Sequence, residues 1–151
     1  MPLVIDGNDM VHLRDDGVFD APIDKIWKYL NDERPGVHNH QSITGTKTVE
    51  QKGNSVVQEM EMRNPDGKTT RMETGRTVMN PPSGFEMESI SGISKGTRYS
   101  HRYTPLGSKT RVEVEGDFKM EGMDEATTKN AALGYFAEVF DEDNASLRKY
   151  E

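Results

Sequence analysis

The chain is 151 residues long and carries a net charge of −7 at pH 7; 32% of its residues are hydrophobic, its mean hydropathy is −0.82, and it contains no cysteine. This length predicts one domain over residues 1–151, and the lack of cysteine excludes disulfides and thiolate metal sites. The acidic balance with scattered basic residues argues against nucleic acid as a partner, and no apolar run reaches the ~18 residues that predict a membrane span.

The first elements predicted are a strand and a helix. Residues 10–19 alternate weakly, without identifying which face is buried. Residues 20–30 carry apolar side chains at helical spacing, and Pro22 suits a first helical turn. Residues 37–40 form either a second short helix or a turn. The first residues lack the basic and long apolar parts of a signal peptide, so we expect a cytoplasmic protein.

Alternating apolar and polar residues in the middle of the chain predict six further strands. Turns rich in Gly, Pro and Asn separate them, and the clearest is Asn64-Pro65-Asp66-Gly67. Short connections of this kind predict an antiparallel meander. The expected strands are residues 43–51, 55–63, 69–79, 85–90, 97–104 and 111–120.

Residues 123–150 predict one long helix, because they contain no proline, carry Asp124 near the start and carry Arg148 and Lys149 near the end. The apolar stripe of this helix consists of Leu133, Phe136, Phe140 and Leu147. Asn144 falls in the same stripe, where it either reaches a ligand or the sheet, or marks the point where the helix passes the sheet edge. The opposite face is predicted to be polar and to include Glu138 and Glu142. A helix of this length needs a broad apolar partner, and a curved sheet supplies one.

Three stretches resemble the START-like (SRPBCC) helix-grip superfamily, which includes polyketide cyclases/dehydrases, lipid-transfer domains and pathogenesis-related plant proteins. Residues 19–30 resemble its entry into the first helix, residues 103–112 resemble its penultimate hairpin, and the closing amphipathic helix is the third. The resemblance implies an α+β fold: a curved antiparallel seven-stranded sheet wrapped around a long C-terminal helix, with two short helices between the first two strands. It also implies a hydrophobic cavity between sheet and helix.

Alternation within residues 97–104 sends Tyr99, His101 and Tyr103 inward, because Arg98 and Arg102 suit solvent. Such a trio can form a polar wall in an apolar pocket. His101 is the candidate catalytic residue, since an imidazole transfers protons near neutral pH. The alternative is a packed aromatic patch with a satisfied histidine.

Other candidate ligand-binding residues follow from the same parity argument. Arg76 shares its parity with Met72 and Thr74, so it is either a buried cation facing an anionic ligand or is returned to solvent by a twist near Gly75. The flexible methionines are either core or a pliable cavity lining. The complete predicted ligand-binding set is Gln58, Met60, Met72, Thr74, Arg76, Met87, Tyr99, His101, Tyr103, Phe136 and Phe140.

No cofactor or metal is expected. His38 and His40 are two residues apart, but no cysteine or acidic residue accompanies them at a ligand spacing, so they are interpreted as loop residues or as polar residues at a cavity mouth. Three functions remain open: binding of a small hydrophobic ligand such as a lipid, polyketide-like or aromatic molecule; cyclase/dehydrase-type catalysis in the same cavity; or stimulation of a protein partner by a solid domain. We expect a monomer or homodimer.

Overall fold

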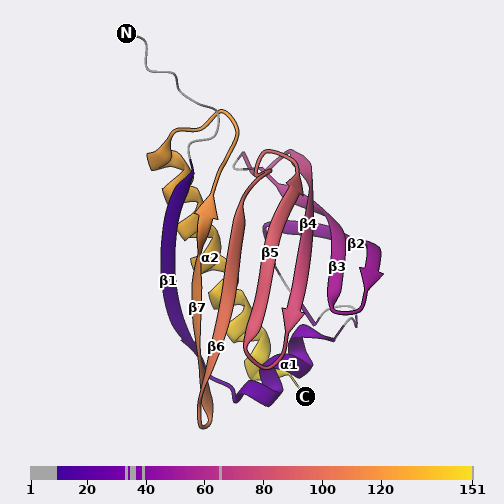
Figure 1. Cartoon of the computed structure of the whole chain (residues 1–151), viewed down its shortest axis with the longest axis vertical. Coiled ribbons are helices and arrows are strands. Elements are labelled where there is room, and N and C mark those ends of the chain that lie inside the picture. The colour runs from indigo at the N-terminus through magenta and orange to yellow at the C-terminus, as the bar shows by residue number, and fades with distance from the viewer. Residues whose placement is uncertain (1–9, 33, 35–36, 39, 65, 151) are drawn as a thin grey trace.

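The computed structural model describes residues 10–32, 34, 37–38, 40–64 and 66–150. Seven strands and two helices follow one another in the predicted order (Figure 1). They are β1 (Val11–Phe19), α1 (Ile23–Leu30), β2 (Ile43–Lys52), β3 (Ser55–Arg63), β4 (Thr70–Asn80), β5 (Gly84–Ser91), β6 (Arg98–Leu106), β7 (Lys109–Phe118) and α2 (Glu125–Lys149).

The strands form one antiparallel seven-stranded sheet with the order β1-β7-β6-β5-β4-β3-β2. The meander therefore runs from β2 to β7, and β1 pairs with β7 to complete the sheet. This confirms the predicted α+β helix-grip architecture. The expected second short helix is only partly testable: α1 is the helix found between β1 and β2, Val37, His38 and His40 are not helical, and residue 39 lies outside the described residues.

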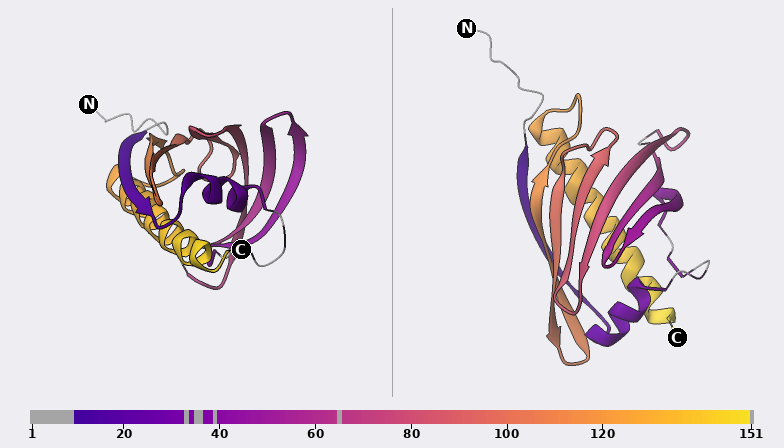
Figure 2. Two further views of the ribbon diagram at one scale, coloured as in Figure 1. Left: turned by 90° about the horizontal axis from the view of Figure 1, so that it is seen from below. Right: turned by 45° about the vertical axis from the view of Figure 1, so that its right-hand side comes forward.

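The sheet is curved, and α2 crosses its concave side while α1 lies at one end (Figure 2). The elements closest to α2 are β1, β7 and α1. Strand β2, at the opposite edge of the sheet, is exposed along nearly its whole length. The helix is therefore held at one side of the curved sheet. Within the described residues, no helix is long and apolar enough to cross a membrane.

Local signals explain the bounds of α2. The Asp124 carboxylate accepts a hydrogen bond of 2.7 Å from the Thr127 N–H and caps the N-terminus, while Arg148 and Lys149 lie in the last turn. Two acids of the predicted polar face, Glu138 and Glu142, are half-buried. They accept hydrogen bonds from the segment that leads into β2.

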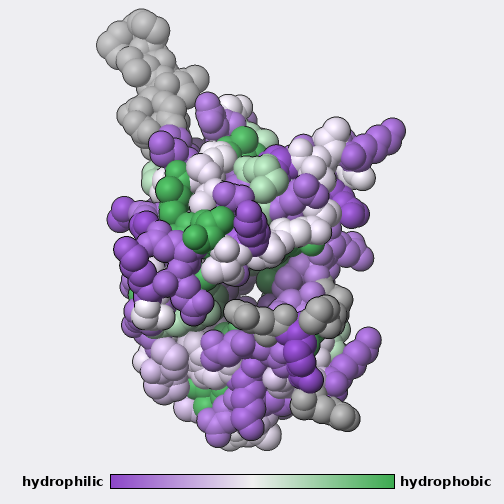
Figure 3. Space-filling view, turned by 90° about the vertical axis from the view of Figure 1, so that its right-hand side faces the viewer, coloured by the Kyte–Doolittle hydropathy of each residue, from purple (hydrophilic) through white to green (hydrophobic). Residues whose placement is uncertain are grey.

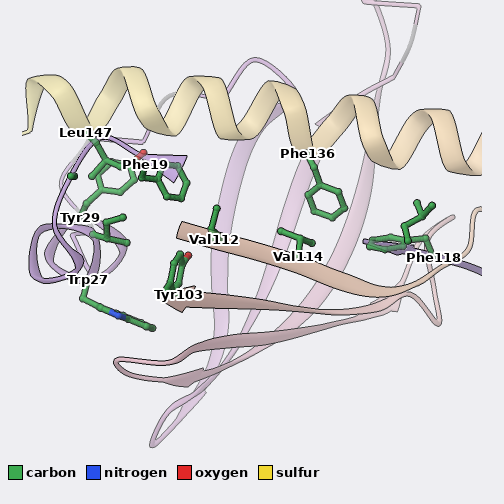
Figure 4. Packing of buried hydrophobic residues seen from close by; sticks show 12 residues of the cluster. Phe19, Trp27, Tyr29, Tyr103, Val112, Val114, Phe118, Phe136 and Leu147 are labelled. Atoms are coloured by element: carbon green, nitrogen blue, oxygen red, sulfur yellow. The ribbon is translucent and has the colours of Figure 1, made fainter. Parts of the chain in front are cut away.

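The hydrophobic core lies between α2, α1 and the β1–β7–β6 side of the sheet. Figure 4 shows Phe136 projecting from α2 toward the sheet, where its ring meets Phe118 edge-on with centroids 5.3 Å apart. The buried members of this core are Leu13, Phe19, Ala21, Ile26, Trp27, Tyr29, Tyr103, Val112, Val114, Phe118, Phe136 and Leu147.

Close aromatic packing fixes α2 to β1. The rings of Phe140 and Phe19 stack with centroids 4.7 Å apart. Phe140 also lies over Gly17, where a Cβ atom would come within 2.7 Å of the ring, so the approach requires glycine. One turn further along, the Asp20 N–H donates to Oδ1 of Asn144 over 3.1 Å. Asn144 thus contacts the backbone at the end of β1, which was one of its two predicted roles.

Truncating the core-facing end of α2 should destabilise the fold. Leu147 is 1% exposed, so Leu147→Ala is expected to lower the free energy of unfolding by about 2–5 kcal/mol through lost burial and a residual void. Leu106→Ala is the matched control, because Leu106 is 51% exposed and should cost about 0.5 kcal/mol or less. Urea denaturation of both variants measures the difference, and equal losses would contradict this assignment of the core.

Candidate functional site

A cavity of about 480 Å³ lies between the first half of α2 and the inner face of β3 to β6. Figure 3, which views the molecule from its β2 and β3 side, shows this face hollowed near its middle. The apolar part of the wall is rich in flexible thioether side chains. These are Met60, Met62, Met87, Met120 and Met123. The sheet and the helix therefore enclose space that the core residues leave unfilled.

A second cavity of about 330 Å³ lies beside the second half of α2 and extends to the edge between β1 and the helix. Its wall contains more polar groups than the core around it, including His101, Tyr103 and Asp143. The two cavities share the side chains of Met87, Tyr99, Tyr135 and Phe136. We call them the larger and the smaller cavity; the shared residues form the boundary between them.

Most of the predicted ligand-binding residues do line these cavities. Met60 lines the larger one, and His101, Tyr103 and Phe140 line the smaller one. Three more line both: Met87, Tyr99 and Phe136. The inward orientation of Tyr99, His101 and Tyr103 agrees with the alternation of β6, whose Arg98 and Arg102 are exposed.

Four predicted residues line neither cavity: Gln58, Met72, Thr74 and Arg76. Met72 is 55% exposed, and the guanidinium of Arg76 lies 3.5 Å from the Glu88 carboxylate. Gln58 is half-buried near the sheet edge, where its Nε2 donates to Oγ1 of Thr48 over 3.4 Å. The predicted inner face of β4 was therefore wrong.

Both faces of β4 mix polar and apolar residues, so alternation does not identify the inner one. The surroundings of Gly75 identify it instead. A Cβ atom at Gly75 would meet the methyl groups of Met87 and Met60, both of which line the larger cavity. The inner parity of β4 thus includes Arg71, Glu73 and Gly75 rather than their neighbours. The charged pair that replaces Arg76 at the cavity is Arg71 and Glu73.

Arg71 and Glu73 form a polar corner of the larger cavity. Glu73 is 5% exposed and accepts hydrogen bonds from the Ser94 N–H and hydroxyl over 3.1 and 3.3 Å. Nε of Arg71 lies 3.7 Å from the Glu73 carboxylate, which is an ion pair but too long for a hydrogen bond. This Nε is buried and has no hydrogen-bond partner among the described residues. It is a buried donor left unpaired next to the cavity.

His101 is a buried histidine in the wall of the smaller cavity. Its ring stacks on Phe85 with centroids 4.3 Å apart, and its buried Nδ1 has no hydrogen-bond partner within the described part of the chain. Burial lowers the pKa of His101 to about 4, and the nearby negative charge of Asp143 opposes this only in part. The imidazole is therefore neutral at pH 7, and one of its nitrogens can accept a hydrogen bond.

The tyrosines around His101 are held protonated. Burial raises the pKa of Tyr99 and of Tyr103 above the ordinary value of 10, and it raises the pKa of Tyr135 to about 12. The Tyr99 hydroxyl lies 3.4 Å from the Met87 sulfur, a weak acceptor. These phenols are consequently hydrogen-bond donors facing an apolar space.

Tyr135 and Asp143 belong to the site although they were not predicted. Asp143 accepts a hydrogen bond of 2.6 Å from the Tyr29 hydroxyl, and its carboxylate lies 3.2 Å from Nε2 of His40. Its position was accessible from the sequence, since it lies three residues after Phe140 and four before Leu147 in the buried stripe. His40, read as a loop residue or a residue at a cavity mouth, is half-buried against Asp143 and Glu142.

With this geometry established, the relationship to known proteins is clear. Residues 10–150 match the family described as polyketide cyclase/dehydrase and lipid transport, so the chain belongs to this family. Its fold places it in the START-like (SRPBCC) helix-grip superfamily. No curated protein matches the chain.

Solved structures with low sequence identity share the fold. The di-domain aromatase/cyclase StfQ of the steffimycin biosynthetic pathway is 14% identical with a TM-score of 0.72, over 93% of this chain and 50% of that one. This chain thus spans half the length of that protein. The ZhuI aromatase/cyclase from Streptomyces sp. R1128 is 13% identical over 91% of both chains, with a TM-score of 0.68. Ara h 8.0201 is 11% identical over 93% of this chain and 99% of that one, with a TM-score of 0.73.

The buried neutral His101 predicts an acid-sensitive fold. Because its pKa falls from 6.5 in the unfolded chain to about 4 in the folded one, the unfolded state binds the proton first as the pH drops. Stability is therefore lost between about pH 6.5 and pH 4, and His101 alone should account for about 2 kcal/mol between pH 7.5 and pH 5.

The measurement is urea unfolding of the wild type and of His101→Phe at both pH values. The variant should lose about 2 kcal/mol less than the wild type on acidification. His12→Ala is the control, because hydrogen bonds to Asp117 and Glu115 raise the pKa of the exposed His12, an effect of opposite sign. An identical pH dependence in wild type and His101→Phe would show that His101 is not buried in its neutral form.

Proposed function

We propose that this protein binds a small apolar molecule in the larger cavity, between the sheet and α2. The observation that carries the proposal is a methionine-rich cavity of about 480 Å³ beside a core built of aromatic and aliphatic side chains. Pockets that hold small organic ligands measure about 300–1,000 Å³ and combine apolar walls with a few polar groups. The family description, which includes lipid transport, supports the same function.

Polar atoms at two places would orient the ligand. The unpartnered Nε of Arg71 can donate to an oxygen at one corner of the larger cavity, next to Glu73. At the boundary with the smaller cavity, Tyr99 and Tyr135 present protonated hydroxyls. Burial of the apolar part gives the affinity, and each satisfied polar atom removes the cost of leaving it unpaired. A mostly hydrocarbon or aromatic molecule with one or two oxygen atoms fits this arrangement.

Filling the larger cavity tests the proposal. Ala132 projects from α2 into it, so Ala132→Phe should weaken binding of the neutral fluorescent probe N-phenyl-1-naphthylamine about tenfold or more, since each 1.4 kcal/mol of lost interaction is tenfold. Ala145→Phe is the matched control on an exposed position of the same helix and should leave binding unchanged. Probe fluorescence is measured together with thermal unfolding of each variant.

Equal probe affinity in the wild type and Ala132→Phe, with both folded, would contradict binding in the larger cavity. Probe binding that Ala145→Phe weakens as much as Ala132→Phe would place the site outside the cavity. Independently of the probe, native mass spectrometry of gently purified protein would identify a ligand that copurifies.

A second candidate function is cyclase-type catalysis in the smaller cavity. It is favoured by the neutral His101, whose Nδ1 lacks a partner and which is surrounded by protonated tyrosines. An acceptor and several donors facing one apolar space can move protons between carbon and oxygen in a polyketone. By contrast, the third possibility, a solid domain that only stimulates a partner, gains no support from a core with two cavities.

Catalysis is tested with a synthetic poly-β-ketone thioester as substrate. His101→Gln should reduce cyclisation about 100-fold or more, the usual contribution of a general acid or base, while probe binding in the larger cavity persists. His12→Gln, which changes an exposed histidine on β1, is the control. Wild-type protein that does not accelerate cyclisation, or unchanged turnover in His101→Gln, would reject the enzymatic function and leave the binding function standing.

A further inference from the structure

Three side chains from two distant parts of the chain converge near the start of β2. His38 and His40 lie in the connection between α1 and β2, and Asp143 lies on α2 more than a hundred residues later. One ligand-type atom from each of the three lies within 4.8 Å of the other two. The shortest distance recorded among them is 3.2 Å, between Nε2 of His40 and Oδ1 of Asp143.

This distance fits a shared ion. Zn²⁺ binds histidine nitrogen and carboxylate oxygen at about 2.0–2.2 Å in tetrahedral geometry, which places two ligand atoms about 3.3 Å apart. His40 and Asp143 already have that separation. His38, which is on an exposed part of the connection, would be the third ligand.

In each of the two histidines, one ring nitrogen contacts a neighbouring group. Nδ1 of His40 lies 3.1 Å from the Glu142 carboxylate, and Nε2 of His38 lies 2.9 Å from the Asp32 carbonyl oxygen. In His40 this leaves Nε2 on the side of Asp143, and in His38 it makes Nδ1 the ring nitrogen that an ion would use. Histidines that bind metal ions almost always make such a contact through their second nitrogen, usually to a carboxylate or a backbone carbonyl.

The carboxylates are oriented and are only partly solvated. The Tyr29 hydroxyl donates to Asp143 over 2.6 Å, and Tyr29 itself is buried. The Glu142 and Asp143 side chains are each 18% exposed, so two negative charges lie close together in a poorly hydrated place. Such a place favours a cation, since charges removed from water need a partner of opposite sign.

We propose that His38, His40 and Asp143 form a binding site for a divalent transition-metal ion, with Zn²⁺ as the reference ion. Two imidazoles and one carboxylate suit zinc and related ions better than calcium or magnesium, which prefer oxygen. Three protein ligands leave a coordination position open for water or another molecule. Because Asp143 also lines the smaller cavity, the ion would lie beside that cavity.

The other histidine with acidic neighbours does not have this geometry. His12, on the outer face of β1, contacts Asp117 through Nδ1 and Glu115 through Nε2, each at 2.9 Å. The two carboxylates therefore lie on different sides of one ring and cannot share an ion with it. All three side chains are about half exposed or more. His12 is thus a matched control for nonspecific binding by histidine and carboxylate groups.

The test uses the full chain after treatment with a chelator. We expect calorimetry with ZnCl₂ to give one ion per chain and CoCl₂ to produce the visible absorption bands of a four-coordinate ion. His38→Gln and Asp143→Asn should each weaken Zn²⁺ binding by roughly tenfold or more, since even changes around the ligands cost 10–100-fold. His12→Ala should leave the affinity unchanged. Circular dichroism verifies the fold of each variant.

Several outcomes would overturn the proposal. They are the absence of Zn²⁺ binding by the wild type, unchanged affinity in folded His38→Gln, or a loss in His12→Ala as large as that in the site variants. His38 is exposed, so its variant remains decisive even where Asp143→Asn fails to fold. Zinc binding and probe binding in the larger cavity are measured separately, so either proposal can fail without the other.

Discussion

The contact of Phe140 with Phe19 and Gly17 sets the position of α2, and the rest of the architecture depends on it. The ring lies so close to β1 that no side chain larger than hydrogen fits beneath it. This packing fixes the helix at the β1–β7 side of a curved sheet, while β2 lies at the opposite edge. A helix held at one side cannot also fill the space under β3 to β5. The larger cavity is the geometric result of that asymmetric attachment.

Among the described residues, most of the buried polar side chains line the space under α2. The Arg71–Glu73 pair, the Tyr99 and Tyr135 hydroxyls and the His101 imidazole all line a cavity. A buried polar atom without a partner costs stability, so a core built only for folding would exclude it. In the rest of the core the buried polar groups are paired, since the Thr110 hydroxyl donates to the Ala21 carbonyl and the Tyr29 hydroxyl donates to Asp143. The buried polar atoms without partners therefore lie beside the space that a ligand would occupy.

The sequence predicted the strands and the long helix well, because alternation and helical spacing report which residues of an element share a face. In β7, where Val112, Val114 and Phe118 oppose charged neighbours, the buried face was unambiguous. In β4 both faces mix polar and apolar residues, and the side chain of Met87, which lies over Gly75, identifies the inner one. The cluster around Asp143 could not be predicted from spacing, since its members meet only when α2 crosses the end of the sheet.

The methionine wall of the larger cavity has a consequence for selectivity. A thioether side chain has several rotatable bonds and a polarizable sulfur, so the wall can be reshaped at small energetic cost. Met60, Met62 and Met87 would lose rotational freedom around any guest, and that entropy is subtracted from the affinity. A receptor built in this way distinguishes ligands by size and polarity more than by detailed shape. It accepts a range of related molecules, each bound less tightly than a rigid aromatic pocket would bind one.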